Sequence, residues 1–463
     1  MSNMKGDLVV SFLSPSSPPI SSIASSPLES VCSTKDDLPE QNLAAKVYLQ
    51  CQRLWESSEI KIGDEIQTAR HRSFPITVSD ENGSDEFIFQ VPNDTSDIEL
   101  TAAVYNYIHQ ELDLKANTPR VHHKNSGFDG PVGHPYLVFS RLPGLSLQET
   151  WPNLTHEQRL SVARQVGELY LDLQSATNSH CGLFKVPMDR YGHSMEGSVL
   201  LEAFGQQRYH LENTERDSIE LEEDGLVNLN NLRKDPPGLS ARDMAILTFE
   251  RRKYYSSASR RQWLEEYTDK AVDMIKAITH KGLLDDTICI WHRNISAENI
   301  LIERDANGEP KITGLLGWDG AGFAPRFMTC RAPQWLWTRV GTKVVRFAPG
   351  PCDGNIHVSK GYPEMDEEPF EAFEPTKSEA KKIKAAFDEA VGEVFTRAAY
   401  DTHMIIARRL MHVAACSVWD LDHTQELAMI FAEWEHRKIR AEKLKEGVRN
   451  MLDRGEVRRR GSL

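Results

Sequence analysis

The sequence predicts an α+β fold in which a small β-rich N-terminal lobe is followed by a larger, mostly helical lobe. Three observations support this prediction. Residues 43–140 contain short runs of β-forming residues around a single helical pattern. Residues 141–440 carry several long helical patterns, interrupted by a β-rich segment at 288–325. At 463 residues, the chain is long enough for two or three lobes with a sizeable core.

The composition is that of an ordinary soluble globular protein, and it excludes several classes. Hydrophobic residues make up 40% of the chain and charged residues 26%. No run of about 18 apolar residues occurs, so we expect no membrane-spanning helix. The N-terminus lacks a basic segment followed by an apolar core, which argues against secretion. The net charge of −14 disfavours a nucleic-acid partner, because phosphate backbones bind basic surfaces.

The seven cysteines are scattered, and none of them forms a Cys-x-x-Cys pair. This odd number without metal-ligand spacing predicts reduced thiols and no zinc site. We therefore expect a cytoplasmic protein.

The N-terminal tail, residues 1–42, differs in composition from the rest of the chain. Residues 11–30 contain nine serines and four prolines. They have too few apolar side chains to offset the conformational entropy that the chain would lose on folding. We expect this tail to be disordered. It could be a spacer or a phosphorylated regulatory segment.

Residues 43–140 predict strands around one helix. A buried strand is expected at residues 87–91, after a turn at 81–83, and a second strand is expected at residues 135–139. Between them, residues 98–112 predict a helix. Its apolar positions at helical spacing are Leu100, Val104, Tyr107, Ile108 and Leu112. Pro143 and Gly144 then interrupt the chain, which marks a hinge.

The sequence predicts helices in residues 141–440. Thr155 and Gln158 form a capping box before a helix with one apolar stripe. The stripe comprises Leu160, Ala163, Val166, Leu169 and Leu173. Further helices are expected at residues 261–281, 378–394, 400–418 and 424–444, and an exposed acidic insertion at 213–237.

The C-terminal segment, residues 441–463, is expected to be a basic tail. Residues 437–460 hold ten Lys and Arg against four Asp and Glu. Such a charge run is typical of a solvated helix end, and a docking or nuclear-import segment is the alternative.

Residues 288–325 carry the clearest chemistry in the chain. Two β-forming runs, 300–303 and 311–316, flank Asn307 and Gly308, a strong hairpin signal. A polar loop, residues 292–299, precedes this hairpin, and a glycine-rich loop, residues 317–322, follows it. The sequence thus predicts a site formed by two loops on a stiff strand pair.

These two loops resemble the catalytic and metal-binding segments of the aminoglycoside phosphotransferase and choline kinase-like family, in particular its large fungal group. The family pattern is His-x-Asp-x-x-x-x-Asn in the first loop and Ile-Asp-Trp-Glu-x-Ala-Gly-Phe in the second. The spacing matches from His292 to Asn299 and from Leu316 to Phe323. The resemblance implies a protein-kinase-like two-lobe fold, with residues 43–140 as a nucleotide-binding lobe and residues 141–440 as a helical lobe.

Three positions depart from the family pattern. Asn294 stands where the resemblance places the catalytic Asp, and Gly317 stands where it places a metal-binding Asp. Gln90 replaces the cation that holds the nucleotide phosphates and pairs with a Glu on the next helix. Glu99 is the expected helix acid, so we expect an acid whose cation is missing.

The resemblance also implies roles for the remaining site residues. Asn299 is the second metal position, and Asp319 is a carboxylate that a rebuilt loop could bring to the metal. His292 is a catalytic-loop residue, for which bracing of the backbone is the alternative role. Backbone groups from Ser140 to Leu142 would contact an adenine. ATP and Mg²⁺ are thus possible cofactors, bound weakly or not at all.

Three hypotheses about function follow. The leading one is a pseudokinase with lost or severely reduced phosphotransfer that binds a small molecule, a nucleotide without Mg²⁺, or a protein partner. The second is an active ATP-dependent phosphotransferase that acts on a small-molecule hydroxyl through a rebuilt metal site. The third is a repurposed fold with other chemistry.

Overall fold

A computed structural model describes residues 43–187 (apart from 57, 69–70, 82 and 94–97), 199–204, 239–258, 263–279, 285–338, 375–415 and 421–453. Residues 44–463 form one compact unit. The predicted tail at 1–42, the acidic insertion and the last ten residues lie outside the described residues. The lobe boundary expected at residue 140 stays a prediction.

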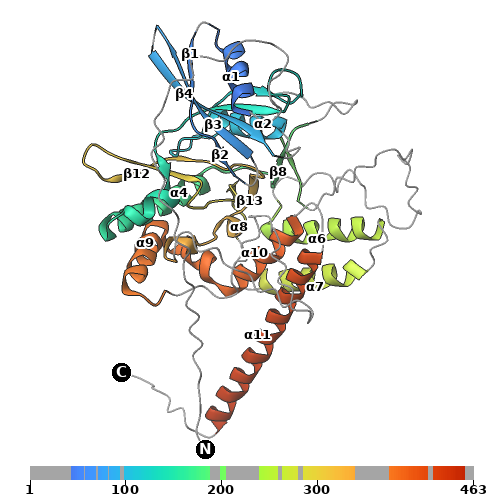
Figure 1. Cartoon of the computed structure of the whole chain (residues 1–463). Coiled ribbons are helices and arrows are strands. Elements are labelled where there is room, and N and C mark those ends of the chain that lie inside the picture. The colour runs from blue at the N-terminus through green and yellow to red at the C-terminus, as the bar shows by residue number, and fades with distance from the viewer. Residues whose placement is uncertain are drawn as a thin grey trace, which may run out of the picture. The chain divides into compact units, whose positions relative to one another are not determined.

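The N-terminal part of this unit contains a six-stranded antiparallel sheet and two helices (Figure 1). The strand order is β1-β3-β4-β6-β5, and β2 pairs with β3. The elements are α1 (Leu43–Leu54), β1 (Glu59–Ile62), β2 (Ile66–Gln67), β3 (His71–Asp80), β4 (Gly83–Pro92), α2 (Ile98–Glu111), β5 (Val121–Asn125) and β6 (Tyr136–Ser140). The expected helix and both expected strands are confirmed.

The two faces of this sheet are covered by different elements. Phe87 of β4 stacks on Trp55, just after α1, with ring centroids 4.9 Å apart. Phe139 of β6 lies 4.9 Å from Tyr105 of α2. Because side chains alternate along a strand and paired residues share a face, Gln90, which pairs with Leu137, lies on the face that carries α2.

Two smaller sheets follow in the chain, with strand orders β10-β13-β8-β9 and β12-β11-β7. Their strands are β7 (Leu145–Ser146), β8 (Gly182–Lys185), β9 (Leu200–Glu202), β10 (Ile288–Trp291), β11 (Ile300–Arg304), β12 (Pro310–Leu315) and β13 (Gly322–Pro325). The expected hairpin is β11 paired with β12. Its turn is held by Asp305 Oδ1, which accepts the backbone N–H groups of Asn307 and Glu309 at 2.8 and 2.9 Å.

The remaining described chain is mainly helical. Its elements are α3 (Leu147–Thr150), η1 (Trp151–Asn153), α4 (His156–Ser175), α6 (Ala241–Ala258), α7 (Trp263–Thr279), α8 (Arg326–Thr329), η2 (Gln334–Leu336), α9 (Ser378–Tyr400), α10 (Thr402–Ala415) and α11 (Leu421–Asp453). The capping box at Thr155 and Gln158 is confirmed, with both reciprocal hydrogen bonds at 3.2 Å. An α+β fold is therefore observed, as predicted.

Two C-terminal helices extend beyond their predicted ends. The expected end of α9 at residue 394 falls beside an interruption at Gly392, whose φ is +75°. The helix resumes because Phe395 packs against Tyr170 of α4, with ring centroids 5.3 Å apart. Helix α11 continues to Asp453, through the boundary expected at residue 440.

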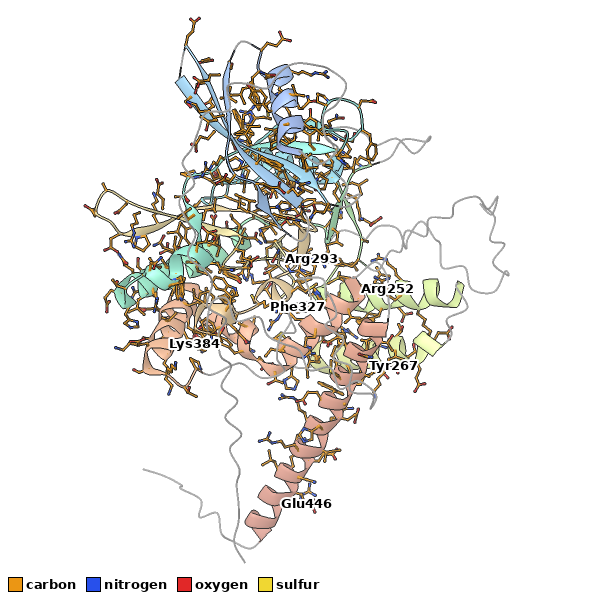
Figure 2. All side chains as sticks on the ribbon, viewed as in Figure 1. Arg252, Tyr267, Arg293, Phe327, Lys384 and Glu446 are labelled. Atoms are coloured by element: carbon orange, nitrogen blue, oxygen red, sulfur yellow. The ribbon has the colours of Figure 1, made fainter. Side chains whose placement is uncertain are left out.

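Buried arginines connect the helices of this part. Arg408 Nη1 donates to the carbonyl oxygens of Phe327 and Ala398, at 3.0 and 2.6 Å. Arg252 Nε donates to the carbonyl oxygen of Ala414 at 2.9 Å and so joins α6 to α10; Figure 2 labels Arg252 and Phe327. These guanidinium groups satisfy carbonyls near helix ends that the helices leave without partners.

In the described part of the chain, no helix has the length and apolar character needed to cross a membrane.

We expect the buried ion pair between Arg409 and Glu426 to hold α11 onto α10. The two side chains are 6% and 8% exposed and make two hydrogen bonds, at 2.6 and 2.8 Å. Arg409→Met should lower the free energy of unfolding by about 3–5 kcal/mol, because it leaves a buried carboxylate without its partner. Adding Glu426→Leu should recover most of this loss in urea unfolding followed by circular dichroism. Equal stability of the single and double variants would contradict the account.

Candidate functional site

His292 follows β10 and joins the two polar loops. Its Nε2 donates to the Leu316 carbonyl at 2.9 Å, and its Nδ1 accepts the Asn294 backbone N–H at 3.2 Å. Accepting at Nδ1 fixes the neutral tautomer with its proton on Nε2. The ring is 2% exposed and lies 4.3 Å from the ring of Trp318, and burial lowers its pKa from 6.5 to about 3. His292 therefore acts here as a neutral brace between the loops.

Arg293 has a left-handed backbone with φ +66°, which is uncommon for a residue other than glycine. Its guanidinium lies 5.0 Å above the Trp291 ring, and Nη1 donates to the Gly320 carbonyl at 3.4 Å. Figure 2 labels this side chain. Arg293 thus makes a second connection between the first loop and the glycine-rich loop.

Asn299 and Gly317 are packed against each other. Asn299 Nδ2 donates to the Asn294 carbonyl at 2.9 Å, and the Asn299 carbonyl accepts the Leu316 N–H at 2.8 Å. Gly317 has φ +78°, and a Cβ added there would lie 2.6–2.8 Å from the amide atoms of Asn299. The two residues that the resemblance expects at a metal are thus brought together. The Asn299 side chain occupies the space that a side chain at position 317 would need.

Asp319 is directed toward α2. Thr101 Oγ1 donates to Asp319 Oδ1 at 3.4 Å, and the Gly317 N–H donates to the Tyr105 hydroxyl at 3.2 Å. Burial, together with the nearby Asp319 charge, raises the pKa of Tyr105 above its usual range, so its hydroxyl stays neutral. Thr101 and Tyr105 are four residues apart and share one side of α2. Helix and glycine-rich loop are therefore joined by two hydrogen bonds, one of them to the carboxylate.

The expectation that Glu99 lacks a cation is wrong. Glu99 forms an ion pair with Lys124 of β5, and both side chains are largely shielded from water. The cation comes from the edge strand, whereas Gln90 lies on β4, two strands away. At about 100° per residue, Glu99 lies about 200° around α2 from Thr101. The ion pair therefore ties α2 to β5, on a different side of the helix from the glycine-rich loop.

The backbone of the expected hinge is partly engaged within the protein. Ser140 N–H donates to the Arg120 carbonyl at 2.8 Å, and Ser140 Oγ accepts the Arg120 N–H at 2.8 Å. Arg141 N–H donates to the Glu86 carbonyl at 3.0 Å. The Leu142 N–H donates to none of the residues that the structure describes.

Thr101, Tyr105 and Lys124 were not singled out by sequence reasoning. The four-residue spacing of Thr101 and Tyr105 was available, but it identifies a shared helix side and not the loop that the side contacts. Lys124 lies 25 positions beyond its partner Glu99. No local pattern relates residues at such a separation.

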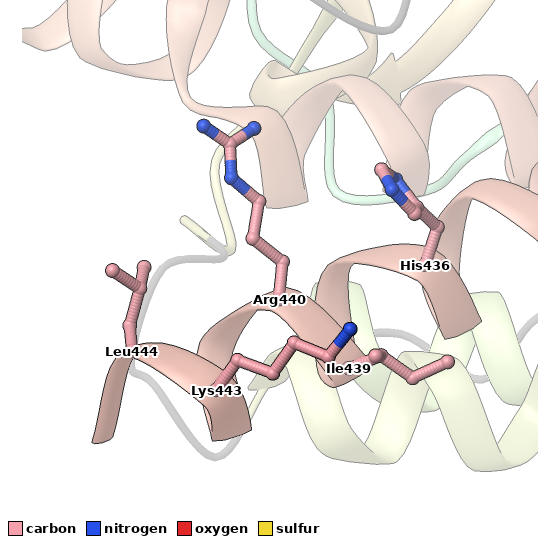
Figure 3. A pocket seen from close by; sticks show the side chains of 5 residues that line it. All are labelled: His436, Ile439, Arg440, Lys443 and Leu444. Atoms are coloured by element: carbon pink, nitrogen blue, oxygen red, sulfur yellow. The ribbon is translucent and has the colours of Figure 1, made fainter. Parts of the chain in front are cut away.

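A surface hollow of about 370 Å³ lies on α11 (Figure 3). It is lined by His436, Ile439, Arg440, Lys443 and Leu444. None of these residues belongs to the two loops, so the hollow is not part of the candidate site. Over the described residues, no group of three or more His, Cys, Asp and Glu side chains is arranged to hold a metal ion.

Comparison with known proteins gives one extensive match. The model of the phosphotransferase enzyme family matches residues 75–328, which is 254 of the 463 residues. A solved structure, a thermostable mutant of aminoglycoside phosphotransferase APH(4)-Ia with AMP-PNP and hygromycin B, is 13% identical; 61% of this chain and 73% of that chain are covered, with a TM-score of 0.34.

A second solved structure is similarly distant. The GDP and kanamycin complex of APH(2″)-IIIa is 14% identical; 89% of this chain and 96% of that chain are covered, with a TM-score of 0.30. None of the curated proteins compared with the chain matches it. At these TM-scores the structural similarities carry no argument, so the family match depends on the family model.

The buried state of His292 predicts a pH dependence of stability. The folded pKa of about 3 is below the 6.5 of an exposed imidazole, so below pH 6.5 the unfolded chain binds a proton that the folded chain does not. The contribution of His292 is full above pH 6.5 and is lost as pH falls toward 3. Between pH 7 and 5, the protein should lose about 2 kcal/mol more stability than His292→Gln. Equal losses in urea unfolding, or an imidazole NMR titration of His292 near pH 6.5, would contradict this.

The packing of Asn299 on Gly317 predicts an unequal response to alanine at two glycines. Gly308 has a similar φ of +81°, but an added Cβ there would meet nothing within 4 Å. Gly308→Ala should therefore cost only the backbone strain, about 1–2 kcal/mol. Gly317→Ala should lower the free energy of unfolding by roughly 2 kcal/mol more than Gly308→Ala does. This additional loss should vanish when Asn299 is also replaced by alanine. Equal costs in urea unfolding would show that the position is open.

Proposed function

Because the chain belongs to the phosphotransferase enzyme family, we propose that it is a kinase-like protein with lost or severely reduced phosphotransfer, which acts by binding a small molecule or a nucleotide without Mg²⁺. Residues 43–140 would be its nucleotide-binding lobe and residues 141–440 its helical lobe. Asn294 and His292 stand at the catalytic positions, and Asn299 and Asp319 are the remaining candidates for a metal.

The observation that carries this proposal is the packing of Asn299 on Gly317. The family's metal-binding carboxylate would have to occupy position 317, which here has no side chain and no space for one while the Asn299 amide keeps its present position. The Asn299 amide at the second metal position already donates to the Asn294 carbonyl. The residues at both metal positions therefore already make contacts within the protein.

The size of each loss supports the same proposal. Phosphoryl transfer depends mainly on positioning and on neutralising charge at the phosphates. A missing general base costs roughly 10²–10⁴ in rate, so Asn294 alone would slow an enzyme without stopping it. A missing metal removes several kcal/mol of charge stabilisation. Loss of the metal carboxylate at position 317 is therefore the decisive change, and Gln90 adds the loss of a phosphate cation.

The residues present do not fit a resident Mg²⁺. Asp319, the nearest carboxylate along the chain, accepts from Thr101 of α2, and this hydrogen bond would have to break before Asp319 could serve a metal. A nucleotide base could still meet the Leu142 N–H at the hinge, in the segment that begins at Ser140. ATP binding that does not depend on Mg²⁺ is the form of nucleotide binding that these contacts favour.

One observation favours a second candidate function. The Asp319 side chain is exposed in the glycine-rich loop, so a ligand that released it from Thr101 could give a rebuilt metal site. The protein would then be an ATP-dependent phosphotransferase that acts on a small-molecule hydroxyl.

Four described cysteines, Cys51, Cys181, Cys289 and Cys330, are free thiols, which supports a place in the reducing cytoplasm for either candidate.

A thermal-shift titration with ATP, with and without Mg²⁺, distinguishes the two candidates. We expect ATP to raise the melting temperature equally in both conditions, or not at all, because no metal bridges protein and phosphates. We also expect no Mg²⁺-dependent release of phosphate. Turnover that requires Mg²⁺ and is abolished by Asp319→Asn would overturn the proposal. Glu303→Gln, an exposed carboxylate on β11, is the matched control and should have no effect.

A further inference from the structure

The first half of α11 is packed into the helical part of the protein. Leu427 and Ile430 are fully buried, and Trp434 is nearly so. Phe431 lies 5.7 Å from Tyr267 of α7, and Trp434 lies 6.0 Å from His403 of α10. These contacts define one apolar stripe along the helix and the elements that cover it.

The second half of α11 has no such cover among the described residues. The side chains at 440–446 are all exposed, and Leu444 is 63% exposed. In Figure 2, Glu446 lies toward the C-terminal end of α11, far from Tyr267 of α7. A solvated helix of this length without tertiary contacts is only marginally stable, and Gly447 weakens it by about 1 kcal/mol relative to alanine.

The apolar stripe continues into this uncovered half in the same register. Spacings of three and four residues relate the positions Leu427, Ile430, Trp434, Arg437, Ala441, Leu444, Val448 and Met451. This is the a and d pattern of a coiled-coil seam. One seam position, Arg437, is polar, and its Nε lies 2.5 Å from Glu433 Oε1 one turn earlier. Among the described residues, α7 and α10 cover the seam at one end, and Leu444 is exposed toward the other end.

Basic residues flank the uncovered part of the seam. In this register Lys438 and Lys445 are e positions and Arg440 is a g position, all of them exposed. A second copy of α11 in parallel would place Arg440 opposite Lys445 of its partner, and such like-charge pairs disfavour association. A helix with acidic e and g positions would instead be complementary to Lys438, Arg440 and Lys445.

We propose that residues 435–453 of α11 are a docking helix for a protein partner that presents an amphipathic helix with apolar a and d positions and acidic flanks. The partner helix completes the seam that α7 and α10 begin. Leu444 supplies the central apolar contact, and Lys438, Arg440 and Lys445 select the acidic partner. This surface involves no residue of the two-loop site, so it is independent of the proposed function.

The test uses the full-length protein and a synthetic helix of about four heptads with Leu at a and d and Glu at e and g. Fluorescence anisotropy should show binding of this acidic helix and none of a matched helix with Lys at e and g. Leu444→Glu should weaken binding at least tenfold. Ile439→Glu makes the same change at an exposed position about 140° around the helix from Leu444, and should leave affinity within twofold.

Three results would overturn the proposal. The first is that the acidic and the basic helix bind equally well, or that the Leu444→Glu and Ile439→Glu variants bind the acidic helix with equal affinity. The second is self-association of the full chain in ultracentrifugation that Leu444→Glu removes, which would identify a second copy as the occupant. The third is Leu444-dependent binding to vesicles of anionic phospholipid with no binding of the acidic helix, which would identify a membrane surface. Circular dichroism of both variants checks that the fold is retained.

Discussion

The backbone of Leu316 fixes the geometry of the site. Its N–H donates to the Asn299 carbonyl at 2.8 Å, and its carbonyl accepts from His292 at 2.9 Å. One peptide segment is thus held on both sides by the first loop, immediately before Gly317. The neutral tautomer of His292, the packing of Trp318 on its ring and the position of Asn299 all depend on these two hydrogen bonds. These two hydrogen bonds therefore link the first loop to the segment that leads into the glycine-rich loop.

These contacts determine which groups of the site remain available for a metal or a ligand. Asn299 faces the empty position at Gly317, and the glycine-rich loop is joined to α2 through Tyr105 and Thr101. An active phosphotransferase needs carboxylates directed at a metal. In this chain the corresponding groups make contacts within the protein. These contacts are the basis of the proposal that the protein binds a ligand without transferring a phosphoryl group.

Local signals in the sequence predicted much of the fold. The hairpin at Asn307 and Gly308, the capping box at Thr155 and the helix at 98–112 each depend on residues a few positions apart. The ion pair of Glu99 with Lys124 could not be predicted, because it joins different elements and gives Glu99 a partner from β5 and not from position 90. The two-loop site was located by its motif spacing. The packing of Asn299 on Gly317 depends on φ and on tertiary contacts that spacing does not specify.

Binding of Mn²⁺ measured by electron paramagnetic resonance tests the central claim most directly. Mn²⁺ substitutes for Mg²⁺ at oxygen ligands, and a protein metal site would hold it more tightly than ATP alone does. The account predicts that, at saturating ATP, the protein leaves the affinity of Mn²⁺ for ATP unchanged. A protein-dependent increase in Mn²⁺ affinity that disappears in Asp319→Asn would contradict it.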